Sequence, residues 1–103
     1  MAGNQGAESR FAFGDRIDIS NVERLQPLID PLLEPQRPAR IVLDVSRVLL
    51  CDSSGLRLLI SLQRRAANAG KTVELFRPRS MFREILTHSD LIHLFTIVDG
   101  DAA

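Results

Sequence analysis

The chain has few of the residues that mark special architectures. Tryptophan and tyrosine are absent, and Cys51 is the only cysteine among 103 residues. One cysteine excludes an internal disulfide and is compatible with a reducing compartment. Lysine plus arginine and aspartate plus glutamate number 13 each, so no overall charge attracts nucleic acid or an anionic membrane. We therefore expect no nucleic-acid partner. Because no apolar run approaches the length of a membrane span, we also expect no direct membrane insertion.

The length predicts one domain, since 103 residues cannot enclose two separate cores. Small polar residues dominate positions 1–9, which we expect to form a flexible tail before a folded domain at 10–99 and a short C-terminal tail at 100–103. The first residues lack the charged and apolar regions of a signal peptide, so the expected location is the cytoplasm.

Strand-like and helix-like segments alternate along the chain. Strands are expected at 10–13, 40–45, 71–76 and 96–98, and helices at 20–32, 52–69 and 80–87, with a turn or short helix at 89–95. Ser20 and Glu23 have the spacing of a capping box at the start of the 20–32 helix, and Pro27 and Pro31 inside it predict that this helix is bent or broken. In the 80–87 helix we expect Met81 to point inward. The alternation predicts a small α/β domain with central parallel strands.

Small polar residues gather at 52–55, between a buried strand and a leucine-rich helix. Right-handed crossovers place this segment at the carboxyl end of a strand, where open α/β sheets usually carry functional groups. One interpretation is structural: Asp52 or Ser53 caps the helix, and Gly55 permits close packing. The other is that a serine hydroxyl is presented there to a kinase, and that the helix dipole and the loop amides would hold its phosphate.

Several segments occur together in a specific order: the strand 41–45, Asp-Ser-Ser-Gly-Leu at 52–56, the leucine-rich helix, the strand 72–76 and the closing segment 85–95. In this combination the chain resembles the STAS domain of bacterial anti-sigma-factor antagonists. Arg16-Ile17-Asp18 is similar to the Gly-x-Leu-Asp element of that family. The resemblance implies a mixed, mostly parallel sheet with helices packed mainly on one face.

The resemblance also implies a function by binding. Ser53 matches the serine that the family's partner, an anti-sigma factor with serine-kinase activity, phosphorylates. The unphosphorylated antagonist binds this anti-sigma factor and releases a sigma factor, phosphorylation breaks the contact, and a phosphatase restores it. The expected partner-binding residues are Asp18, Asp52, Ser53, Ser54, Gly55 and Arg57. Arg57 stands where the family usually has a glycine. No cofactor or metal is implied, and we expect a monomer or a weak homodimer.

Other interpretations stay open beside this one. Catalysis would need a base near Ser53 or Ser54, and His88 and His93 lie far downstream, so we expect no enzyme. Basic residues predominate at 56–83 and suggest one local basic face. Some single STAS domains are instead constant subunits of a lipid-transport ABC ATPase or scaffolds of a stress-sensing complex, and use the same helix without a kinase. The paired serines favour the switch.

Overall fold

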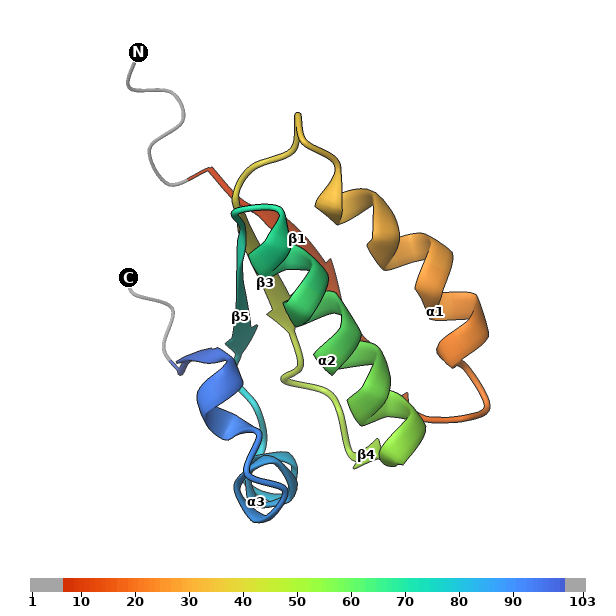
Figure 1. The fold of residues 1–103 in the computed structure, drawn as a ribbon. Coiled ribbons are helices and arrows are strands. Elements are labelled where there is room, and N and C mark those ends of the chain that lie inside the picture. The colour runs from red at the N-terminus through yellow and green to blue at the C-terminus, as the bar shows by residue number, and fades with distance from the viewer. Residues whose placement is uncertain (1–6, 100–103) are drawn as a thin grey trace.

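A four-stranded parallel sheet forms the centre of the fold in the computed structural model, which describes residues 7–99 (Figure 1). The strand order is β1-β3-β5-β6, and every pairing is parallel. The strands are β1 Ser9–Ala12, β3 Arg40–Asp44, β5 Thr72–Phe76 and β6 Thr96–Val98. In β3 the three consecutive residues 41–43 are buried, as expected for a strand that is covered on both faces, whereas in β5 only Val73 and Leu75 are buried. The expected α/β class with a mostly parallel sheet is confirmed.

Two short strands form a separate parallel ladder, β2 Arg16–Ile17 with β4 Leu50–Cys51. Ile17 pairs with Cys51 in this ladder. The residues that follow both strands, from Asp18 and from Asp52 onward, therefore leave the ladder at the same end. This pairing brings together two segments that are more than thirty positions apart in the sequence.

Helices α1 (Val22–Ile29) and α2 (Ser53–Asn68) lie next to each other over one face of the sheet (Figure 1). The third helix, α3 (Ser80–His88), follows β5, and the 3₁₀ helix η3 (Ile92–Leu94) leads into β6. Helix α2 is anchored by fully buried Leu59 and Leu62. It ends before Gly70, whose φ of 75° is the left-handed conformation expected after a helix C-terminus.

The start of α1 differs from the sequence prediction. The capping box of Ser20 and Glu23 does not form, because the helix begins one residue later and has Asn21 in the capping position. The Ser20 hydroxyl and amide instead donate to the Asp18 carboxylate. The predicted interruption by proline is confirmed at Pro31, because α1 ends at Ile29 and Pro31 lies in the 3₁₀ helix η2 (Asp30–Leu33), whereas Pro27 lies within α1.

The amino-terminal boundary also differs slightly. Strand β1 begins at Ser9, within the segment 1–9 that was expected to be a tail, because Ser9 pairs with Ile41 at the edge of the sheet. Residues 1–6, which are most of the expected N-terminal tail, and 100–103, the expected C-terminal tail, lie outside the described residues.

Candidate functional site

The Asp52 carboxylate joins the start of α2 to the loop after β2. One oxygen, Oδ1, accepts a hydrogen bond from the Gly55 amide at 2.9 Å, which makes Asp52 the N-cap of α2. The other, Oδ2, accepts from the Ile19 amide at 3.1 Å. The amide of Gly55, with smaller contributions from those of Ile19 and Ser54, lowers the pKa of Asp52. The carboxylate thus remains ionised and fixes the relative position of the two segments.

Gly55 is buried at the closest approach of α2 to the β2–β4 ladder. A Cβ atom at this position would overlap the carbonyl oxygen of Ile17, and would lie 2.8 Å from the Ile17 carbonyl carbon and 2.9 Å from Cys51 Sγ. The glycine is therefore required for packing. Because it has no side chain, α2 can pack directly against β2, and this contact positions the surrounding surface. A direct contact between Gly55 and a partner stays a prediction.

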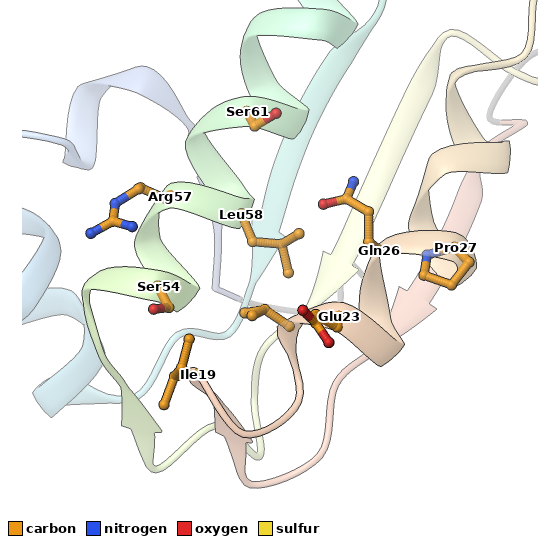
Figure 2. A pocket seen from close by; sticks show the side chains of 9 residues that line it. Ile19, Glu23, Gln26, Pro27, Ser54, Arg57, Leu58 and Ser61 are labelled. Carbon is orange, nitrogen blue, oxygen red and sulfur yellow. The ribbon is translucent and has the colours of Figure 1, made fainter.

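The two serines of the motif have different surroundings. Ser53 is the first residue of α2 and is exposed. Ser54 is half-buried and lines a groove beside Ile19 (Figure 2). Of the two hydroxyl-bearing residues, Ser53 is the more accessible to an enzyme from solution.

Asp18 is buried rather than displayed on the surface. Its carboxylate accepts from the Ser20 amide at 3.0 Å, and its Oδ2 lies 3.6 Å from Arg16 Nη1. Its own amide donates to the Asn21 side-chain oxygen at 2.9 Å. These contacts shape the loop that carries Ile19, so Asp18 supports the surface from below. Direct contact of Asp18 with a partner stays a prediction.

Cys51 lies beneath this site with a protonated thiol. Its side chain is buried, and burial raises the pKa of the thiol to about 12, assisted by the nearby Asp52 and Asp18 carboxylates. A thiol with this pKa is not a nucleophile at neutral pH. Cys51 therefore acts as a small buried hydrophobic residue of the core.

A groove of about 580 Å³ lies between α1 and α2 beside the serine motif. Figure 2 shows side chains from both helices facing it, with Ser54 and Ile19 at one end. Its lining residues are Ile19, Val22, Glu23, Gln26, Pro27, Ser54, Arg57, Leu58 and Ser61. Ile19 is 71% exposed although it is a large apolar residue. An open groove next to an exposed apolar side chain is typical of surfaces that bind another molecule.

Further apolar side chains are exposed just before β4 and at the start of α3. Leu49 is 57% exposed and Met81 is 65% exposed, and both line a second hollow of about 540 Å³. The prediction that Met81 points inward is wrong, because the inward face of α3 is formed by Phe82 and Leu86. Sequence analysis also missed Ile19 and Leu49. Their apolar character alone resembles that of core residues, and their exposure depends on the loop conformation.

The basic residues at 56–83 do not form one face. Arg65 pairs with Asp30 at 3.0 Å, and Arg83 donates two hydrogen bonds to Asp99. Lys71 is buried and donates to the carbonyl oxygens of Arg37 and Pro38. Arg57 is exposed beside the groove, and its contact with a partner stays a prediction.

In the described part of the chain, neither histidine lines the groove beside the serines, and no metal-ligating group accompanies them. His88 ends α3 and His93 lies in η3, and both are exposed. Residues 7–99 contain no group of three or more histidine, cysteine, aspartate or glutamate side chains placed to hold a metal ion. Over the same residues, no helix combines the length and the apolar character needed to cross a bilayer.

Several solved structures share this fold at low sequence identity. A sulfate transporter family protein from Wolinella succinogenes superposes with a TM-score of 0.78 at 16% identity, covering 91% of this chain and 78% of that one. A Thermotoga maritima protein described as a candidate anti-sigma factor antagonist gives 0.77 at 16% identity, covering 99% and 93%. The anti-sigma factor antagonist SpoIIAA of Bacillus gives 0.77 at 19% identity in its unphosphorylated form, covering 93% and 82%, and its phosphorylated form is also solved.

Curated proteins include no significant sequence match to this chain. A family model does match: residues 2–98 fit the family described as "Mlab, STAS domain". The match spans nearly the whole sequence and agrees with the fold and with the motif at the start of α2. The chain therefore belongs to the STAS-domain family.

Proposed function

We propose that this protein is an anti-sigma-factor antagonist that acts by binding and is switched at Ser53. In its unphosphorylated form it binds an anti-sigma factor of the serine-kinase type, which then releases a sigma factor. The kinase transfers the γ-phosphoryl group of ATP to Ser53 Oγ and leaves ADP, and a phosphatase later removes the phosphate by hydrolysis. The observation that carries the proposal is an exposed serine at the first position of α2, beside a groove that ends at the exposed Ile19.

The charge of a phosphate explains how such a switch would act. Phosphoserine carries about −1.5 to −2 charges near neutral pH. On Ser53 this charge would stand next to the ionised Asp52 and near the exposed side chain of Ile19. A partner that covers this apolar surface would have to bury the phosphate without hydration, which is costly. Phosphorylation would therefore end the contact without unfolding the protein.

In this proposal the protein is a cytoplasmic regulator, not an enzyme, and it needs neither a cofactor nor a metal. It presents Ser53, Ser54 and Arg57 to the partner, while Asp18, Asp52 and Gly55 hold those residues in place. It functions as a monomer or a weak homodimer.

The direct test is to incubate the protein with ATP and the kinase-type anti-sigma factors of the same organism, and to locate any phosphate by mass spectrometry. We expect phosphate on Ser53 in the wild type and none in Ser53→Ala. Ser80→Ala is the matched control, because Ser80 is also an exposed serine at the first position of a helix. Ser53→Asp should bind the anti-sigma factor at least tenfold more weakly than Ser53→Ala; equal affinities would refute the switch.

A second candidate is a constant STAS subunit of a lipid-transport ABC ATPase or a scaffold of a stress-sensing complex. The description of the matched family supports this candidate, because that description names Mlab and not an antagonist. This candidate uses the same surface without phosphorylation. It predicts a stable complex with an ABC ATPase that Ser53→Asp leaves intact, in contrast to the antagonist.

A further inference from the structure

We propose that the Arg57 guanidinium group forms an ion pair with the phosphate on Ser53 and holds this phosphate against the surface of α2. The inference rests on the proposed function in taking Ser53 as the phosphorylated residue. It adds a residue with a defined role in the switch. Phosphorylation would then both add an anion to the binding surface and withdraw a cation from it.

The spacing along α2 brings the two side chains together. Ser53 and Arg57 both belong to α2 and are four positions apart. Residues at this separation lie on the same face of a helix with their Cβ atoms about 5–6 Å apart. Side chains on a helix also lean toward its N-terminus, so Arg57 leans toward the turn that carries Ser53. A guanidinium group can bind two oxygens of a phosphate at once.

The backbone amides at the start of α2 are not all available to donate hydrogen bonds to a phosphate. The sequence alone suggested that the helix dipole and the loop amides would hold it. In the structure Asp52 already accepts from the amides of Gly55 and Ile19, and the Ser54 amide also contributes to lowering its pKa. A phosphate on Ser53 would compete with this carboxylate and be repelled by it. A side-chain cation is therefore the partner that remains.

Arg57 has no competing partner among residues 7–99. It takes part in neither a salt bridge nor a side-chain hydrogen bond within this range, whereas Arg65 and Arg83 are each paired with an aspartate. Figure 2 shows its guanidinium group extended away from α1. Glu23, the acidic residue that lines the same groove, belongs to α1. Arg57 can thus turn toward a phosphate without breaking an existing interaction.

The pairing can be measured without any kinase. Phosphoserine is incorporated genetically at position 53 of the full chain, and its second pKa is followed by phosphorus NMR between pH 4 and 8. The same measurement is made on Arg57→Ala and on Arg64→Ala. Arg64 is the matched control, because it is exposed on the same helix and unpaired within residues 7–99. It lies eleven positions from Ser53, which corresponds to about 16 Å along the helix axis, beyond the screening length at physiological salt.

We expect Arg57→Ala to raise the phosphate pKa by about 0.5 unit, as for an exposed ion pair, and 0.5 M NaCl to abolish most of this difference. Arg64→Ala should leave the value within about 0.1 unit of the wild type. Equal shifts in both variants, or no shift in either, would overturn the pairing. These outcomes are separate from the failure of the proposed function, which would appear as absence of Ser53 phosphorylation by any kinase-type anti-sigma factor.

Discussion

Replacing Gly55 by alanine tests how closely α2 must approach the β2–β4 ladder. The new methyl group would overlap the Ile17 carbonyl oxygen and would lie 2.9 Å from Cys51 Sγ. Both neighbours are held in place, since Ile17 and Cys51 are paired in the ladder and buried. The overlap with a backbone carbonyl cannot be relieved by a rotamer change. Helix α2 must therefore move, and with it Asp52, Ser53 and the groove.

Two effects of opposite sign determine the magnitude. Overpacking costs about 1–3 kcal/mol, and the rigid backbone contact places this site at the upper end. Alanine gains up to about 1 kcal/mol over glycine inside a helix. The net loss in the free energy of unfolding is about 2 kcal/mol, which for a domain of this size lowers Tm by about 8 °C.

Urea unfolding followed by circular dichroism measures this loss through the midpoint at constant slope. Gly14→Ala is the matched control, because a Cβ atom at Gly14 would meet no atom within 4 Å. We expect its midpoint to stay close to that of the wild type. If Gly55→Ala proves as stable as the wild type or more so, helix propensity outweighs the overlap and the packing argument is refuted.

The remaining predictions concern the two ionisable groups next to Gly55. The Cys51 thiol should react with a disulfide reagent at pH 8 only when the protein unfolds, because burial, followed by Asp52 and Asp18, raises its pKa to about 12; a native thiol as reactive as free cysteine would contradict this. Its contribution to stability should be complete below about pH 9, the ordinary thiol value, and be lost as the pH rises toward 12. For Asp52, the lowered pKa means that the ionised carboxylate stabilises the fold above its ordinary value of 3.8 and loses this effect as the pH falls through the lower folded value. The urea midpoint of Asp52→Asn should accordingly be below that of the wild type at pH 7 and approach it toward pH 3, and a constant difference would argue against the ionised cap.

Local sequence patterns determined most of the elements of this protein. The apolar run at 41–45 predicted the buried strand β3, and Pro31 predicted the interruption after α1. These signals depend on neighbours a few positions away in the sequence, so the strands and helices that they mark can be predicted without knowledge of the fold. The same holds for Ser53 at the start of a helix, which the small polar residues before a leucine-rich stretch indicate without knowledge of the fold.

Only the tertiary structure decided what surrounds that serine. The pairing of Ile17 with Cys51 brings the loop after β2 to the start of α2, where Asp52 binds the Ile19 amide and Gly55 meets the Ile17 carbonyl group. Long-range contact also decided that Asp18 is buried and that Ile19 and Met81 are exposed. Residue type gives the tendency of a side chain to be buried, but its actual exposure depends on which segments pack over it. Those segments are distant in the sequence and leave no local pattern.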